Sequence, residues 1–392
     1  MAQLSVVHLT NAITPDKLGG LERYVRELAE QQSRDGLRVA IITKKVLPTS
    51  PAHEISQHGV VILRHRVPSK SKKTFALRYP FVVVGGVLRD LRQIPRGSIV
   101  HCHYVFTTLP LLLTRRRYIF TFHAPVYKEI LNERGGSYVL PKVVQRSAVS
   151  AVRLVEKMIL RRAQTIVVLS DAMAQEVREL TPQGTSKIVK IPGGFDGEFF
   201  VPSAERRPEL FTSPVQLFTA RRLTTRTGVV ELVEAVGCMR ENGIDVELRI
   251  SGDGHQRNEV ERKIKDLNLE DAVSLLGRIS DDAVRDEYRT ADLVVMPTQE
   301  LEGFGLTTAE AMACGAVVVG TPIGANEEVI GQFNACLVSS DATPQAIADV
   351  VSEAIGNPNL INELRNTASA YAHDKWSWGT VAAAYESLYG RG

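Results

Sequence analysis

The sequence has few cysteines and no long hydrophobic run. Its four cysteines, Cys102, Cys238, Cys314 and Cys336, form no Cys-x-x-Cys pair, so buried thiols in a reducing cytoplasm fit them better than disulfides or zinc ligands. No apolar run reaches the roughly 18 residues of a transmembrane helix. The runs Phe81–Leu88 and Leu109–Leu113 are short and are expected in the core. The first residues resemble a strand rather than a signal peptide. These absences favour a cytoplasmic protein.

Length and charge suggest two dissimilar halves. A chain of 392 residues exceeds one ordinary core, so two domains of roughly 190 residues are expected. The net charge is only +3, but residues 1–195 hold 30 Lys and Arg against 13 Asp and Glu, and the remainder holds 17 against 31. The basic half suits an approach to anionic lipid or to an acidic acceptor. The alternative is a solvated surface whose charge helps the two halves to close.

Short apolar runs alternate with segments of helical period along the chain. Such runs include Val6–Leu9, Val39–Ile42, Val60–Leu63, Ile99–His103, Tyr118–Phe122, Thr165–Ser170, Val215–Ala220, Val246–Ile250, Val273–Leu276, Leu293–Met296 and Val317–Val319. This alternation predicts an α/β fold of βαβ units with parallel sheets. The polar segment Gly197–Glu209 suits a linker. The predicted domains are residues 1–196 and 197–375. Asp171 is expected to be a helix N-cap, and Trp376–Tyr389 is expected to be one amphipathic helix.

The segment from Glu302 to Gly315 carries the most chemical information. It follows the predicted strand Leu293–Met296, and its turn Glu302-Gly303-Phe304-Gly305 opens a helix that ends near Gly315. A strand, a glycine turn and a helix N-terminus together form an anion site. Glu302 and Glu310 would repel a phosphate, so they suit neutral hydroxyls better. The combination predicts a sugar nucleotide as ligand, although Thr307–Glu310 also matches a capping box in the first turn.

The spacing Glu302-x7-Glu310 resembles the donor motif of the retaining glycosyltransferases of family 4, GT4, which have the GT-B fold. Four further segments match the family in the same order, namely Gly19-Gly20-Leu21-Glu22, Thr121-Phe122-His123, Ile191-Pro192-Gly193-Gly194-Phe195-Asp196 and Arg222-Leu223. The resemblance runs from about residue 3 to the C-terminus. It implies two Rossmann-like domains facing across a cleft, with the C-terminal helix, residues 376–392, joined to the first domain.

The resemblance also implies roles for individual residues. Glu302 and His123 would contact the donor sugar, Glu310 would bind the ribose, and Arg222 would stabilise the leaving pyrophosphate. The family often has a lysine where this chain has Thr227, so the neighbouring Arg226 is expected to replace that charge. The other donor-binding residues implied are Gly19, Gly20, Ile279, Phe304, Gly305, Leu306 and Thr307.

A metal cofactor is not expected. The chain has no Asp-x-Asp, so fixed cations such as Arg222 would stabilise the leaving group in place of a metal ion. His101 and His103 flank Cys102 and share one face of a strand. Without a third ligand in the sequence pattern, a metal site there is not predicted.

The sequence therefore predicts a metal-independent, retaining hexosyltransferase that uses a nucleoside diphosphate sugar. Its acceptor, which is lipid-linked or anionic in this hypothesis, would belong to bacterial glycan, glycolipid or natural-product glycoside synthesis. Peripheral membrane association would follow from the basic first domain, and no nucleic-acid partner is expected. One alternative is a nucleotide-dependent oxidoreductase, which needs a Gly-x-Gly-x-x-Gly after the first strand where this chain has only Gly19-Gly20. The other is a non-catalytic sugar-nucleotide binding protein.

Overall fold

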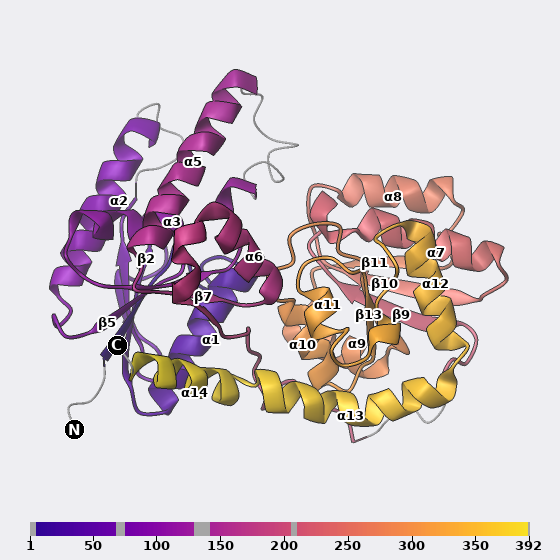
Figure 1. Cartoon of the computed structure of the whole chain (residues 1–392). Coiled ribbons are helices and arrows are strands. Elements are labelled where there is room, and N and C mark those ends of the chain that lie inside the picture. Colours follow the sequence, from indigo (N-terminus) through magenta and orange to yellow (C-terminus); the bar gives the residue numbers. More distant parts are fainter. Residues whose placement is uncertain (1–4, 68–74, 129–141, 205–209, 391–392) are drawn as a thin grey trace. The chain divides into compact units, whose positions relative to one another are not determined.

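The computed structural model describes residues 5–67, 75–128, 142–204 and 210–390. Their contacts divide them into two compact units. The first unit holds the described residues up to 194 together with 378–390, and the second holds those from 195 to 377. Each unit is built around one β-sheet with helices packed against it (Figure 1). The chain passes between the units after Gly194 and again after Ser377, whereas the predicted boundaries follow residues 196 and 375.

The sheet of the first unit is almost entirely parallel. Its strands are β1 (Ser5–Leu9), β2 (Arg38–Lys44), β3 (His53–Ile55), β4 (Val61–His65), β5 (Ile99–Cys102), β6 (Ile119–Phe122), β7 (Thr165–Val168) and β8 (Ile188–Lys190). They lie in the order β3-β4-β2-β1-β5-β6-β7-β8, and only the β3–β4 pair is antiparallel among these strands. The direction of winding reverses between β1 and β5. Ligands of open α/β sheets bind at such a switch point, beyond the carboxyl ends of the strands.

The helices of the first unit differ from the sequence-based prediction in three details. They are α1 (Gly20–Arg34), α2 (Phe75–Arg92), α3 (Val105–Thr108), η1 (Leu109–Leu113), α5 (Lys142–Arg162), α6 (Asp171–Leu180), η3 (Pro182–Lys187) and α14 (Trp378–Tyr389). The N-cap of α6 is Ser170, whose hydroxyl accepts from the amide of Met173, so Asp171 is the first helical residue and not the cap. The expected helix from Trp376 is interrupted because Ser377 is extended. Phe81 and Leu113 are each 78% exposed, so the prediction that their runs lie wholly in the core was wrong.

The second unit has a smaller parallel sheet. Its strands are β9 (Val215–Ala220), β10 (Val246–Ser251), β11 (Val273–Gly277), β12 (Leu293–Met296) and β13 (Val318–Gly320). They lie in the order β11-β10-β9-β12-β13, and every neighbouring pair is parallel. Strand β9 is first in the chain but central in the sheet, so this sheet has its switch point between β9 and β12. The apolar runs of β9 and β12 are buried, as strands covered on both faces require.

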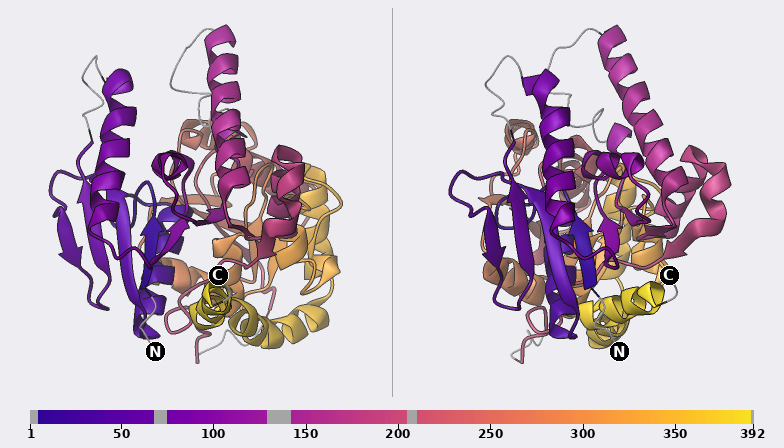
Figure 2. Two further views of the ribbon diagram at one scale, coloured as in Figure 1. Left: turned by 60° about the vertical axis from the view of Figure 1, so that its left-hand side comes forward. Right: turned by 90° about the vertical axis from the view of Figure 1, so that its left-hand side faces the viewer.

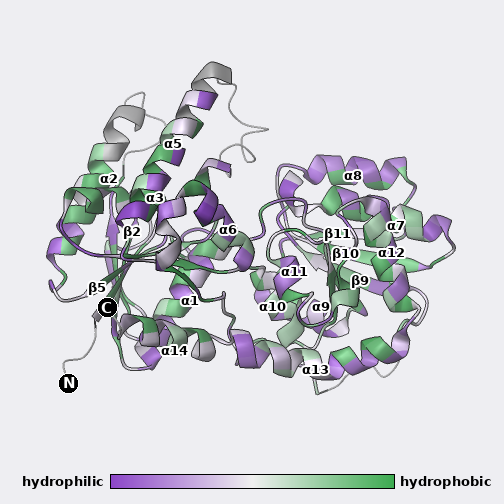
Figure 3. Ribbon diagram, viewed as in Figure 1, coloured by the Kyte–Doolittle hydropathy of each residue, from purple (hydrophilic) through white to green (hydrophobic). Residues whose placement is uncertain are grey.

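Helices cover the second sheet, and three of the α-helices begin at a side-chain cap. They are η4 (Thr225–Thr227), α7 (Val229–Glu241), α8 (Arg257–Asp266), α9 (Asp281–Thr290), α10 (Leu306–Ala313), α11 (Asn326–Val329), η5 (Ala335–Leu337), α12 (Pro344–Ile355) and α13 (Pro358–Trp376). Ser280, Thr343 and Asn357 cap α9, α12 and α13 through their side-chain oxygens. Figure 3 shows α8 as mostly hydrophilic, and only Val260 and Ile264 on it are buried.

Helix α14 is part of the first unit although it ends the chain. It lies beside α1 in Figures 1 and 2, where the hydroxyls of Tyr385 and Tyr24 are 2.6 Å apart. The indole N–H of Trp378 donates to Glu27. A Cβ atom at Gly194 would come within 2.5 Å of the Trp378 ring, so this family-motif glycine permits the close packing of α14. The terminal helix thus packs on the first unit from Trp378 onward, whereas Trp376 ends α13 of the second unit.

Candidate active site

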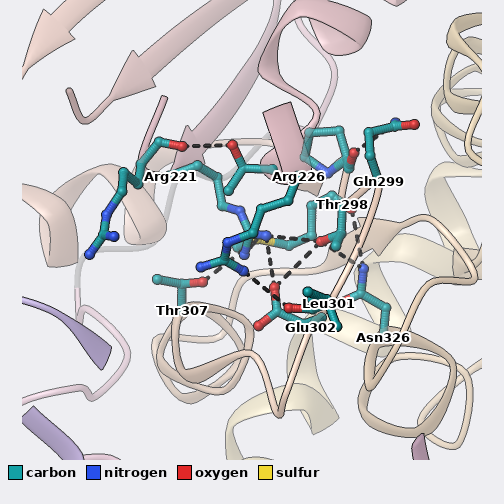
Figure 4. Close-up of polar contacts among 12 residues, drawn as sticks. Arg221, Arg226, Thr298, Gln299, Leu301, Glu302, Thr307 and Asn326 are labelled. Carbon is teal, nitrogen blue, oxygen red and sulfur yellow. Dashed lines mark hydrogen bonds and ion pairs between the residues drawn. The ribbon is translucent and has the colours of Figure 1, made fainter. Parts of the chain in front are cut away.

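The switch point of the second unit gathers the polar residues that follow β9 and β12 (Figure 4). Arg221 is the first residue after β9, and Thr298 and Glu302 follow β12. Because β9 and β12 are parallel neighbours, their carboxyl ends meet at the same edge of the sheet. The site therefore combines residues about 80 positions apart in the chain.

An ion pair between Arg221 and Glu302 is the centre of this edge. Arg221 Nη2 lies 2.7 Å from Glu302 Oε2, and the two side chains are only 7% and 12% exposed. The same Nη2 donates to the hydroxyl of Thr298 at 2.9 Å. That hydroxyl also accepts from the amide of Asn326 at 3.3 Å. The carboxylate is thus held in one orientation by a buried network rather than exposed on a loop.

Electrostatics keep Glu302 ionised. Burial alone would raise the pKa of its carboxyl, but the positive charges of Arg221 and Arg226 outweigh burial and hold this pKa below its ordinary value. The Arg226 side chain turns toward the same loop, where Nη1 donates to the carbonyl of Leu301 at 3.0 Å. Leu301 has a positive φ of 51°, a conformation that costs energy for a branched residue. Arg226 therefore supports the turn that carries Glu302.

Thr227 does not point into the site. Its side chain is buried, and its hydroxyl donates to the carbonyls of Arg222 and Thr224 at 2.6 Å. The backbone carbonyl of Arg226 accepts from the amides of Gln299 and Glu300. These hydrogen bonds hold the η4 turn against the loop after β12. Within the η4 turn, the Arg226 side chain is directed toward the turn that carries Glu302.

Glycines allow these loops to approach closely. A Cβ at Gly228 would lie 1.7 Å from the carbonyl oxygen of Pro297, and one at Gly324 would lie 2.5 Å from that of Glu302. Gly252 and Gly254 pack in the same way against the backbone of Arg221 and Leu223, at 1.8 and 2.1 Å. The glycines of Ser251–Gly254 thus allow the loop after β10 to pack closely against the loop after β9.

Helix α10 begins beside the ion pair. Gly305 is its N-cap with a φ of 86°, and the amides of Leu306 and Thr307 stand at the N-terminus, where a helix leaves its first N–H groups without intrahelical partners. The alternative interpretation of Thr307–Glu310 as a capping box is not supported, because the N-cap is Gly305 and not Thr307. Glu310 is buried in the second turn of the helix, not in the first.

The other predicted donor residues lie around this edge in different environments. Arg222 is exposed, directly beside the buried Arg221. Ile279 is partly exposed just after β11. The Phe304 ring is buried and packs edge-on against Trp376, with centroids 5.7 Å apart, so its side chain belongs to the core of the unit.

The switch point of the first unit lies near His123, which follows β6. Gly20 begins α1 and Gly19 is its N-cap, so the predicted pair stands at a helix N-terminus, as the anion-site hypothesis requires. Glu22 is buried and pairs with Lys17 at 2.6 Å. These residues are in a different unit from Glu302.

Three buried histidines also meet in the first unit. His8 pairs in register with His101 across β1 and β5, and their ligand atoms, together with those of His103, lie within 4.8 Å of one another. The premise that His101 and His103 lack a third potential ligand was wrong, because His8 supplies one. All six ring nitrogens, however, hydrogen bond to neighbouring side chains, so metal binding would have to replace those bonds.

The sequence analysis did not select Arg221 or His8 as site residues. The geometry of β-strands provides a signal that could have pointed to each of them. Side chains alternate along a strand, so Arg221 has the same direction as the buried Leu217 and Thr219, whereas Arg222 has the opposite one. His8 lies within a predicted buried strand, where a polar side chain needs a partner. Its partner strand β5 is about 90 residues away, so the sequence alone does not identify it.

Comparison with known proteins identifies the family. Residues 18–199 match the model for "Glycosyltransferase Family 4", and residues 202–374 match that for "Glycosyl transferases group 1". The chain belongs to glycosyltransferase family 4. Its two parallel-sheet units have the GT-B architecture of this family's solved relatives.

Relatives of this glycosyltransferase cover nearly its whole length. D-inositol 3-phosphate glycosyltransferase of Corynebacterium urealyticum is 26% identical over 95% of this chain and 90% of that protein. Glycogen synthase of Mycobacterium tuberculosis is 24% identical over 96% and 92%. Among solved structures, sucrose-phosphate synthase of Thermosynechococcus elongatus has a TM-score of 0.78 at 19% identity, covering 99% of both chains. HepE of Anabaena in complex with UDP and glucose has a TM-score of 0.75 at 17% identity, covering both chains completely.

Loss of Arg221 should destabilise the glycosyltransferase strongly. Arg221→Met leaves the Glu302 carboxylate buried without its cation, and removal of one partner of a buried pair costs about 3 kcal/mol or more. The measurement is the free energy of unfolding in urea. Arg249→Met on the same sheet is the matched control, because Arg249 is 46% exposed in its pair with Glu287 and should cost less than about 1 kcal/mol. Equal losses in the two variants would contradict the central role of the Arg221 pair.

The buried histidines should make the protein less stable in mild acid. Burial lowers the pKa of His8 from 6.5 to about 4, so the unfolded chain binds its proton more readily than the folded protein. The resulting loss begins as pH falls below about 6.5 and amounts to about 2 kcal/mol for His8 by pH 5. Urea unfolding of the wild type and of His8→Gln between pH 8 and pH 5 measures this term. The difference in free energy of unfolding between the wild type and His8→Gln should shrink toward pH 5. A pH-independent difference would refute the lowered pKa of His8.

Proposed function

We propose that this glycosyltransferase moves a hexosyl group from a nucleoside diphosphate sugar to an acceptor hydroxyl, with retention at the anomeric carbon and without a metal ion. The observation that carries the proposal is the ionised, immobilised carboxylate of Glu302 beside the N-terminus of α10. A helix N-terminus suits phosphate, and a fixed carboxylate suits hydroxyls. The complex of HepE with UDP and glucose supports this donor class.

The proposed transfer needs both a negative and a positive group to stabilise its transition state. As the sugar–phosphate bond breaks, positive charge develops at the anomeric carbon, and Glu302 stabilises it together with the sugar hydroxyls. Negative charge develops on the leaving diphosphate, where Arg222 and the amides of Gly305 to Thr307 stabilise it. In the front-face mechanism implied by the family resemblance, the leaving phosphate accepts the proton of the acceptor hydroxyl. Arginine in place of a metal ion accounts for metal independence.

The remaining predicted residues have, in this proposal, the roles that the family resemblance implies. Glu310 binds the ribose diol, Ile279 lies near the base, and His123 and Gly19-Gly20 contribute from the first unit. Arg226 acts through its bond to Leu301 by holding the Glu302 turn, as well as by its charge. One relative is named for inositol phosphate and another for glycogen, so the relatives identify no single acceptor; we propose only that the acceptor is lipid-linked or anionic.

A donor panel tests the proposal. Thermal stabilisation and slow sugar release should occur with one nucleotide class among UDP-, GDP-, ADP- and dTDP-sugars, and EDTA should not change either. Glu302→Gln should lower kcat about 100-fold or more, as removal of one electrostatic stabiliser does. Thermal stabilisation of this variant by the donor should remain measurable. Glu300→Gln, two positions earlier, is the matched control and should retain activity. Full activity of Glu302→Gln, or activity abolished by EDTA, would be incompatible with this mechanism.

We also propose that the first unit associates peripherally with anionic membranes. No helix among the described residues is long and apolar enough to cross a membrane. Helices α2 and α5 both pack against η1, and these three elements expose Phe81, Leu113 and Leu154 at 78%, 78% and 58%. Exposed Arg115 is two positions from Leu113, and exposed Arg153 is next to Leu154 in the chain. Apolar side chains combined with positive charge suit an anionic lipid surface.

Vesicle co-sedimentation measures this association. The protein should bind vesicles that contain phosphatidylglycerol more strongly than vesicles of phosphatidylcholine, and binding should fall steeply between 0.1 and 1 M salt as the Debye length shrinks from about 10 to 3 Å. Leu154→Gln should weaken binding several-fold. Leu267→Gln, at an exposed leucine of the second unit, should not. Equal binding to both vesicle types would exclude an electrostatic membrane surface.

A further inference from the structure

A chain of hydrogen bonds leads from His123 into the interior of the first unit. His123 Nε2 lies 3.2 Å from His103 Nδ1, and His103 Nε2 lies 2.9 Å from His8 Nδ1. His8 Nε2 in turn lies 2.8 Å from the amide oxygen of Gln32. Each of the two middle rings uses one nitrogen toward each neighbour. The protons along this chain must therefore all point the same way.

The rings in this chain are neutral. Burial lowers the pKa of His8 to about 4 and that of His123 to about 3, and it holds the pKa of His103 well below its usual range. A neutral imidazole has one N–H donor and one bare nitrogen that accepts. A proton on either nitrogen of one ring consequently decides the tautomer of the next.

Gln32 gives the chain its direction. Its amide oxygen faces His8, while its amide N–H donates to the hydroxyl of Tyr389 at 3.2 Å. That hydroxyl is also 2.8 Å from His101 Nδ1. An amide oxygen only accepts, so His8 carries its proton on Nε2 and accepts through Nδ1.

The same rule then applies to the next two rings. His103 donates from Nε2 to His8 and accepts through Nδ1, so the proton between His103 and His123 belongs to His123 Nε2. His123 is left with a bare Nδ1. This atom makes no hydrogen bond to the residues that the structure describes, and the His123 side chain is partly exposed.

The ring and loop of His123 are held from other sides as well. Tyr24 packs edge-on against the ring, with centroids 4.8 Å apart. The buried carboxylate of Glu156 accepts from the amides of Val126 and Tyr127, at 2.7 and 3.4 Å, in the loop that follows His123. The direction in which Nδ1 points is thus fixed along with its protonation.

We propose that Gln32 and Tyr389 are positioning residues that fix, through His8 and His103, the Nε2–H tautomer of His123. His123 then presents Nδ1 as an acceptor, which selects a substrate hydroxyl that donates a hydrogen bond. This second step rests on the proposed function, in which His123 contacts the donor sugar. A fluorine in place of that hydroxyl does not donate, so the site should discriminate against it.

Nitrogen-15 NMR of the full chain, labelled only in histidine, tests the tautomer without any substrate. The His123 signal, identified by its loss in His123→Asn, should be that of the neutral Nε2–H form in the wild type. Gln32→Met leaves a buried His8 N–H without an acceptor, which favours the reversed chain, so the Nδ1–H form of His123 should grow. Tyr389→Phe frees the Gln32 amide to turn and should give a mixture of the two forms.

Tyr118→Phe is the matched control, because it removes a buried tyrosine hydroxyl that donates to the carbonyl of Ile159 and takes no part in the histidine hydrogen-bond chain. Its His123 signal should equal that of the wild type. An Nδ1–H or doubly protonated His123 in the wild type would overturn the proposal. So would an unchanged tautomer in both Gln32→Met and Tyr389→Phe.

Donor binding tests the consequence. Wild-type protein should bind one of the 3-, 4- and 6-deoxyfluoro analogues of UDP-glucose about tenfold more weakly than UDP-glucose, the ratio expected for one lost neutral hydrogen bond. Gln32→Met should reduce that ratio toward one, whereas Tyr118→Phe should keep it. Equal ratios in the wild type and Gln32→Met would overturn the selective role. If UDP-glucose itself does not bind, the donor is a different nucleotide sugar, the same comparison is made with deoxyfluoro analogues of the donor that the panel identifies, and the NMR result still decides the tautomer.

Discussion

Two parallel strand ends, those of β9 and β12, hold an ionised carboxylate out of water, and the second unit is arranged around that constraint. Glu302 would be costly to bury alone; Arg221 makes its burial tolerable. The pair can form only because the chain reverses its direction of winding between these two strands. The glycines at positions 228, 252 and 324 then let the surrounding loops approach without a Cβ in the way. Charge pairing, sheet topology and glycine placement are therefore parts of one solution.

The first unit solves a similar burial problem without charge. Its histidines lie in the sheet centre, where burial keeps them neutral, and hydrogen bonds rather than ion pairs satisfy their nitrogens. Helix α14 supplies Tyr385 and Tyr389 to this network from the far end of the chain. Packing of the terminal helix and organisation of the polar interior thus depend on each other. In a network of neutral imidazoles the direction of donation can reverse, whereas in the Arg221–Glu302 pair the guanidinium always donates.

The sequence predicted the strands well because buried parallel strands are short, continuous apolar runs, and β9 begins and ends where its run does. It missed β3, which has only three residues on the sheet edge. Glu302 and His123 could be selected from spacing and resemblance. Arg221 and His8 could not, since their roles depend on which strands become neighbours. Exposed Phe81 was misplaced because a hydrophobic run does not reveal which of its residues faces solvent.

The two pKa shifts at the proposed sugar contacts have a common electrostatic sense. A hexosyl transition state carries positive charge near the anomeric carbon, so a cation beside the sugar would oppose the reaction and an anion would assist it. The lowered pKa of Glu302 keeps that group negative, and the lowered pKa of His123 keeps that group uncharged. Neighbouring cations thus keep the carboxyl negative, and burial keeps the imidazole uncharged. Neither group therefore places a positive charge beside the sugar. In the proposed reaction, Arg222 stabilises the departing phosphate, the charge of Arg221 is balanced by its pair with Glu302, and His123 contributes by position and by its acceptor nitrogen rather than by charge.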